Sequence, residues 1–129
     1  MRTIDRTFGW LLILATCGHT MGTLKFYPAM TDVWVWSLSA SLAGAILGAI
    51  NIIRAGRSGD GALAVVTAGG CAGWALMALA FGSSIHNLRD PRVVGNVFIA
   101  AVLLACSCAT LRRSFDNKRL GSARAAASV

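Results

Sequence analysis

Glutamate is absent from this chain, and carboxylates of any kind are scarce. The acidic residues are all aspartates, and each lies outside the long apolar runs. A carboxylate inside a membrane span is a common coupling group in proton-driven transport. Its lack counts against a transporter, although a small channel or transporter stays open as a third hypothesis. The aspartates are Asp5, Asp32, Asp60, Asp90 and Asp116.

Charged residues of both signs are few, at 13% of the 129 residues, while 56% are apolar and the mean hydropathy is +0.65. A soluble domain carries about 25% charged residues. The apolar runs must therefore face lipid or each other. The short segments between them leave no room for a hydrolase or kinase site, and the sequence holds no phosphate-binding glycine loop or nucleophile elbow. We expect a protein that is not an enzyme.

Four stretches are long and apolar enough to cross a bilayer, which needs roughly 17–25 such residues. They cover residues 8–27, 33–53, 62–85 and 93–111, and Pro28, the segment "RAGRSGDG" and the segment "RDP" separate them. Although a basic start and a short apolar run resemble a signal peptide, the apolar character resumes afterwards, so a retained helix is expected. The sequence predicts an all-α, up-down-up-down bundle of four transmembrane helices over residues 1–111.

The basic residues indicate an orientation, because cytoplasmic loops carry an excess of lysine and arginine. Both termini and the second loop are basic, whereas the first and third loops hold only Lys25, Arg89 and Arg92. We expect both termini in the cytoplasm and a location in a bacterial inner membrane. The cations on the cytoplasmic side are Arg2, Arg6, Arg54, Arg57, Arg112, Arg113, Lys118, Arg119 and Arg124.

The last segment, residues 112–129, is polar and basic and is expected to be a disordered cytoplasmic tail. Its cations predict attraction to anionic lipid, worth about 1 kcal/mol each near the surface. The net charge of +7 does not indicate nucleic-acid binding, because there is no basic folded face to carry it. The four cysteines lie in apolar runs and are interpreted as packing residues rather than disulfides.

Small residues recur at helical spacing in three of the stretches and predict close helix packing. In the second stretch they form one narrow face, and the first and third each contain a pair of glycines four residues apart. These seams predict a homo-oligomer or contact with another membrane protein. The residues are Gly18 and Gly22, Ser37, Ser41, Gly44 and Gly48, and Gly69 and Gly73.

The first stretch also contains "ATCGHTMGT", a polar cluster inside a span. Thr16, His19, Thr20 and Thr23 follow the spacing i, i+3, i+4, i+7 and share one helix face. An ionisable residue within a span is a candidate functional site. The alternative is that His19 is hydrogen-bonded to a neighbour and only fixes the helix packing.

Other polar residues belong to the same, outer side of the expected bundle. His86, Asn87, Asp90 and Asn96 could converge with His19 on an outward-facing pocket. Such a pocket would suit a small lipophilic molecule, haem or a metal ion of unknown identity. The two histidines differ in depth by roughly 10 Å on the helix-rise argument, which counts against a haem held by both.

The sequence therefore leaves open what the protein does. The favoured hypothesis is a small multi-pass membrane protein that acts through helix packing, as an accessory subunit or a homo-oligomer. The alternative is a ligand, haem or metal-binding protein with its pocket around His19.

Overall fold

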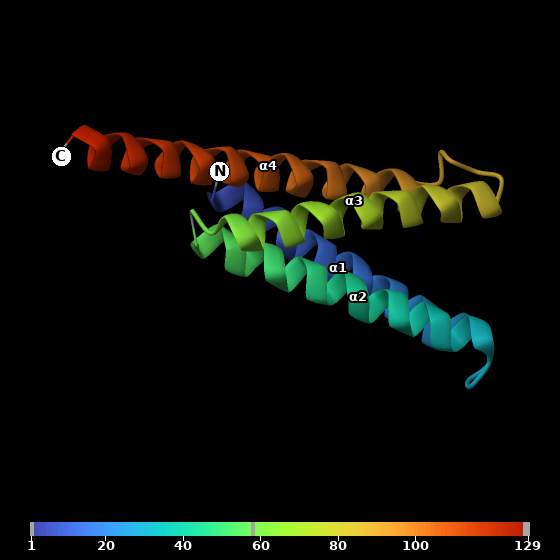
Figure 1. Ribbon diagram of the computed structural model, residues 1–129. Helices are drawn as coiled ribbons and strands as arrows, with labels where there is room; N and C mark the ends of the chain where they lie inside the picture. The colour runs from blue at the N-terminus through green and yellow to red at the C-terminus, as the bar shows by residue number, and fades with distance from the viewer. Residues whose placement is uncertain (1, 58, 128–129) are drawn as a thin grey trace.

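The computed structural model describes residues 2–57 and 59–127, and within them the regular structure is entirely helical. The expectation of an all-α fold is confirmed. Each expected apolar stretch lies largely within one helix (Figure 1). The helices are α1 (Arg2–Phe26), α2 (Asp32–Gly56), α3 (Gly61–Ser84) and α4 (Pro91–Ala127).

Short polar residues set where the middle helices begin. The Thr31 hydroxyl accepts the backbone N–H of Trp34 at 3.3 Å at the start of α2, and the Asp60 carboxylate accepts that of Leu63 at 3.0 Å at the start of α3. Such caps satisfy donors that have no partner within the helix. They keep the connections between successive helices short, so neighbouring helices fold back on each other.

Three helices, α2, α3 and the Pro91–Ala123 part of α4, are long and apolar enough to cross a membrane. This supports a membrane protein in contact with lipid. In α1 the apolar run is interrupted by Gly18, His19, Gly22 and three threonines, and this helix is not among the candidate spans of the described chain. The structure therefore supports three of the four expected spans, and the first stays a proposal.

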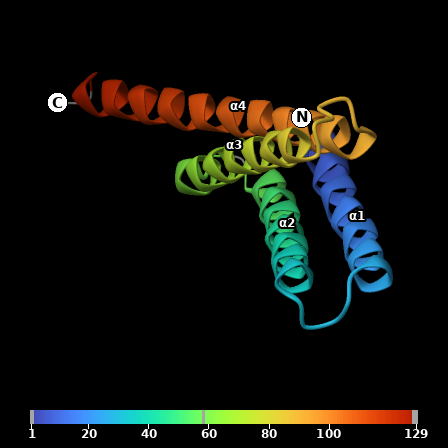
Figure 2. The same cartoon turned by 90° about the vertical axis from the view of Figure 1, so that its right-hand side faces the viewer.

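The helices form two hairpins, α1 with α2 and α3 with α4 (Figure 1). The hairpins meet near the N-terminus and the α2–α3 turn. From there they diverge, so that in Figure 2 α1 and α2 run downwards while α3 and α4 run across the view. The turns that close the two hairpins consequently lie apart.

Glycines bring α1 and α2 together. A Cβ atom on Gly48 would lie 2.8 Å from the Gly9 carbonyl oxygen and 2.8 Å from Ile13 Cγ1, distances that real Cβ atoms do not show. Gly44 and Ser41 continue the same buried face of α2. This is the small-residue stripe of the second stretch, and its partner on α1 is Gly9.

An apolar cluster fills the space where the hairpins meet. Leu12, Cys71 and Leu103, from α1, α3 and α4, are fully buried. Around them pack Phe8, Leu47, Trp74, Ile99 and Leu104. Phe8 also meets Phe98 of α4 edge-to-face, with ring centroids 5.8 Å apart.

The segment after Leu111 differs from the expected disordered tail. It continues α4 as helix to Ala127, while residues 128 and 129 lie outside the described part. The reason is local, because no proline follows Pro91 and the segment is rich in alanine and arginine, both good helix formers. A helix of 37 residues is about 55 Å long, well beyond a hydrocarbon core of about 30 Å.

Replacing Gly48 by alanine is expected to separate α1 from α2. The added methyl group meets backbone on α1, and overpacking of this kind costs about 1–3 kcal/mol. Gly73→Ala is the matched control, because a Cβ there has no atom within 4 Å and alanine is the better helix former. Unfolding in detergent should show Gly48→Ala destabilised and Gly73→Ala unchanged or stabilised. Equal stability of the two variants would contradict the close packing of α1 against α2 at Gly48.

Candidate functional site

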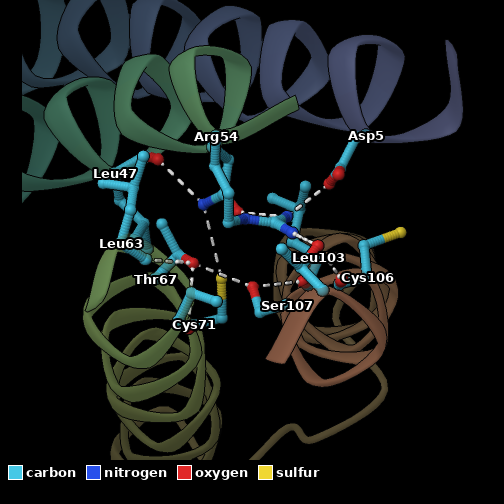
Figure 3. A network of polar contacts seen from close by, with 12 residues as sticks. Asp5, Leu47, Arg54, Leu63, Thr67, Cys71, Leu103, Cys106 and Ser107 are labelled. Carbon is cyan, nitrogen blue, oxygen red and sulfur yellow. Dashed lines mark hydrogen bonds and ion pairs between the residues drawn. The ribbon is translucent and has the colours of Figure 1, made fainter. Parts of the chain in front are cut away.

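A buried arginine lies at the point where the two hairpins meet. The side chain of Arg54, near the end of α2, is 0% exposed. Its guanidinium is ion-paired with the carboxylate of Asp5 on α1, which is 7% exposed (Figure 3). Removing a single charge from water is expensive. Each of these charges is therefore tolerated in the interior because the other one neutralises it.

Arg54 also connects the two hairpins. It donates hydrogen bonds to Asn51 Oδ1 of α2 and to Thr110 Oγ1 of α4, both at 3.0 Å. The Asn51 amide in turn donates to the Leu47 carbonyl at 2.9 Å and lies 3.5 Å from Cys71 Sγ of α3. A single chain of polar contacts thus reaches all four helices (Figure 3).

A pair of hydroxyl groups adds a polar contact between α3 and α4. Thr67 Oγ1 and Ser107 Oγ lie 3.0 Å apart, and both residues are fully buried. Each hydroxyl is also hydrogen-bonded to a carbonyl of its own helix, Thr67 to Leu63 and Ser107 to Leu103. We use the name polar junction for the set Asp5, Asn51, Arg54, Thr67, Cys71, Ser107 and Thr110.

A tryptophan forms a second contact layer between the hairpins. The Trp74 indole N–H donates to Asn96 Oδ1 of α4 at 3.0 Å. The Trp74 ring lies close to Gly44 of α2, since a Cβ atom on Gly44 would be 2.6 Å from the ring edge. The same Cβ atom would also meet the methyl group of Thr16 of α1. These residues again come from all four helices. We call the set Thr16, Gly44, Trp74 and Asn96 the tryptophan layer.

The sequence reasoning missed Arg54 and Asp5, because both were assigned to the charged flanks of the spans. One signal was present in the sequence. Asn51 already continues the small-residue stripe of α2, and Arg54 follows three residues later on the same face. A charge on the buried face of an apolar helix requires a buried partner, and Asp5 supplies it from α1.

The threonines of the α1 cluster are hydrogen-bonded within their own helix. Thr16 and Thr23 are buried and Thr20 is half-buried, and their hydroxyls donate to the carbonyls of Ile13, His19 and Thr16 in their own helix. The His19 side chain is exposed. The threonines of the cluster are therefore turned towards the protein interior, whereas His19 is on the surface.

The candidate residues on the other hairpin are mostly in the α3–α4 turn. His86 has a left-handed backbone (φ 53°) that ends α3, and it is exposed together with Asn87. The carboxylate of Asp90 is paired with Arg92 at 2.8 Å. Hydrogen bonds from the Arg92 guanidinium, and then from its backbone N–H, lower the pKa of Asp90 to about 2.

Within the part of the chain that the structure describes, the residues expected to line an outward pocket lie in different surroundings. Asn96 is engaged with Trp74, and Thr16 packs against Gly44. The α3–α4 turn, which lies away from the α1–α2 turn (Figure 2), contains His86, Asn87 and Asp90. Among the residues that the structure describes, no group of three histidine, cysteine or acidic side chains could hold a metal ion.

The two expected glycine pairs outside α2 lie on open faces. A Cβ on Gly18, Gly22, Gly69 or Gly73 would have no atom within 4 Å. Among the described residues these pairs make no close helix contact, in contrast to Gly44 and Gly48.

The fold and the junction define a helical protein of two hairpins, with three helices that can cross a membrane. No family model, curated protein or solved structure matches the chain.

Neutralising Asp5 is expected to destabilise the fold strongly. Asp5→Asn leaves the Arg54 charge buried without its partner, a change that costs about 3–5 kcal/mol. The double variant Asp5→Leu, Arg54→Met removes both charges and should recover most of that loss. Arg57→Gln, at an exposed position, is the control and should stay within about 0.5 kcal/mol of the parent. Unfolding in mixed micelles measures all three, and a fully stable Asp5→Asn variant would refute the role given to this pair.

Proposed function

We propose that the protein is a non-enzymatic, multi-pass membrane protein that acts through helix–helix contacts, as a homo-oligomer or an accessory subunit. The observation that carries this proposal is the outward face of α1. Gly18 and Gly22 share one stripe of the helix, away from the buried residue Thr16, and a Cβ atom on either glycine would have no atom within 4 Å. Small residues on such a face allow a second helix to approach closely.

The composition of α1 supports the same reading. Among the described helices it is the one that is not a candidate span, and its exposed residues include Cys17, Gly18 and His19 in succession. Lipid is a poor environment for an imidazole. A helix of this kind is better placed against protein than against acyl chains, which supports a protein partner for α1.

The proposal includes α1 as a fourth span, with both termini in the cytoplasm of a bacterial cell. Because the charge of Arg54 is paired inside the fold, it no longer contributes to the orientation signal. The excess of cations on the cytoplasmic side remains without it. It rests on Arg2, Arg6, Arg57 and the extension of α4, against Lys25, Arg89 and Arg92.

Reporter fusions test this orientation. A reporter active only in the periplasm should be inactive when fused after Val129 and active when inserted after Ala29, in the α1–α2 turn. The positive-inside rule gives the physical reason. Activity at both positions would mean that one of α2, α3 and α4 does not cross the membrane, and activity after Val129 alone would invert the topology. A reporter fused ahead of Met1 should be inactive, and activity both there and after Ala29 would mean that α1 does not cross.

The helical extension of α4 is proposed to lie at the cytoplasmic membrane surface and attract anionic lipid. Arg112, Arg113, Lys118 and Arg119 are exposed along it, with Asp116 as a single opposing charge. Each cation near an anionic surface contributes about 1 kcal/mol.

Bulky residues on the glycine face of α1 are expected to abolish self-association. Gly18→Ile with Gly22→Ile adds two branched side chains where close helix approach is needed, without touching the chain's own contacts. Gly69→Ile with Gly73→Ile is the matched control, since it alters an equally open pair on the more apolar α3. Light scattering in mild detergent should show the parent and the α3 variant as oligomers and the α1 variant as a monomer. A monomeric parent would refute a homo-oligomer.

A further inference from the structure

The α4 extension begins at the level of the α2–α3 turn. Ser114 is buried against Gly61, the first residue of α3, where an added Cβ would lie 2.7 Å from the Ser114 hydroxyl oxygen. Beyond this contact, α4 continues as one helix past the turn (Figure 1). In the proposed orientation the turn lies at the cytoplasmic edge of the spans. The residues next to Ser114 are therefore at the depth of the lipid headgroups.

The side of α4 opposite Ser114 faces away from the rest of the molecule. Buried residues mark the inner side at helical spacing, and exposed residues repeat on the other side at a similar spacing. The buried residues are Leu103, Ser107 and Ser114. We use the name outer stripe for the exposed residues Ala101, Ala105, Cys108, Arg112, Phe115 and Arg119.

Within the span, the outer stripe consists of small side chains. Ala101, Ala105 and Cys108 are exposed, whereas the larger Val102 and Leu104, to either side of them, are half-buried. Small side chains let a neighbouring apolar chain come close to the helix backbone. This part of the stripe is suited to an acyl chain that lies along α4.

At headgroup depth, the outer stripe carries two cations. Arg112, Phe115, Asp116 and Arg119 line one open hollow on this side of α4. The two arginines are seven residues apart, with Phe115 between them. Because side chains in a helix lean towards its N-terminus, Arg119 leans towards Phe115 and the membrane. A guanidinium binds phosphate oxygens through two parallel hydrogen bonds.

The charge of the hollow indicates which headgroup it takes. Two arginines and Asp116 leave a single net positive charge, which one phosphodiester group neutralises. A lipid with two phosphates would leave a negative charge without a partner, and a zwitterionic lipid would leave the positive charge in place. The Asp116 carboxylate accepts hydrogen bonds, as from the hydroxyl groups of a polyol headgroup.

We propose that the outer stripe of α4 binds one molecule of an anionic glycerophospholipid. The phosphate lies between Arg112 and Arg119, and an acyl chain follows Ala105 and Cys108 into the membrane. This inference rests on the proposed attraction of the α4 extension to anionic lipid, and it adds a defined site to that attraction.

Lys118 and Arg119 distinguish a bound lipid from diffuse attraction. Diffuse attraction depends on the charge and on its distance from the surface, which are the same for these neighbours. A bound lipid depends on the side of the helix that each cation occupies. Lys118 is about 100° round the helix from Arg119 and lies outside the outer stripe.

Native mass spectrometry of the full chain in detergent, with added dioleoylphosphatidylglycerol, tests the site. The parent should retain one lipid per chain more tightly than any further lipid. Arg119→Gln should weaken this first binding step about tenfold, because it removes hydrogen bonds to a charged group. Lys118→Gln is the matched control and should leave the step nearly unchanged.

Equal losses in these two variants would overturn the site and leave the diffuse attraction standing. A parent that does not prefer phosphatidylglycerol to phosphatidylcholine would refute both. Equal retention of phosphatidylethanolamine would overturn the choice of an anionic headgroup. Inorganic phosphate should not displace the lipid, because it has no acyl chain, and displacement would make the hollow a site for free phosphate instead.

A variant in the apolar part of the outer stripe tests the acyl chain without changing any charge. Ala105→Phe covers the small side chains and should also weaken the first binding step. Ala80→Phe, at an exposed position of α3, is the control and should bind as the parent does. Unchanged binding in Ala105→Phe would overturn the placement of the lipid along α4.

Discussion

The burial of one charge, on Arg54, constrains the rest of this structure. A guanidinium in an apolar interior needs both a counter-charge and hydrogen-bond acceptors. Asp5 provides the first from α1, and Asn51 and Thr110 provide the second from α2 and α4. Meeting these needs draws the ends of the helices together at one place, which fixes how the hairpins are joined.

The α1–α2 hairpin is stabilised by a second interaction. Gly9 and Gly48 let the two backbones touch, in addition to the ion pair of Asp5 with Arg54. Between the hairpins, the apolar cluster of Leu12, Cys71 and Leu103 lies beside polar contacts such as that of Arg54 with Thr110.

Much of the local structure could be predicted from the sequence. The helical pattern and the breakers gave four helices, and the stripe with Gly44 and Gly48 predicted a small-residue face that the structure indeed buries. The helical course of α4 beyond Leu111 was missed, because polarity was given more weight than helix propensity. The candidate site was harder to predict, because the angle between the hairpins decides which residues face a pocket. This applies to Thr16, His19 and Asn96.

The sequence alone determined the helices, their apolar character and the registers of their faces, because these follow from composition and the helical repeat. It could not show that Asp5 and Arg54, 49 residues apart, neutralise each other in the interior, since a charge near the end of an apolar run also fits a solvated flank. Only the tertiary structure decided that pairing. It also decided that His19, in register with buried residues, is exposed, because the hairpins separate before reaching it.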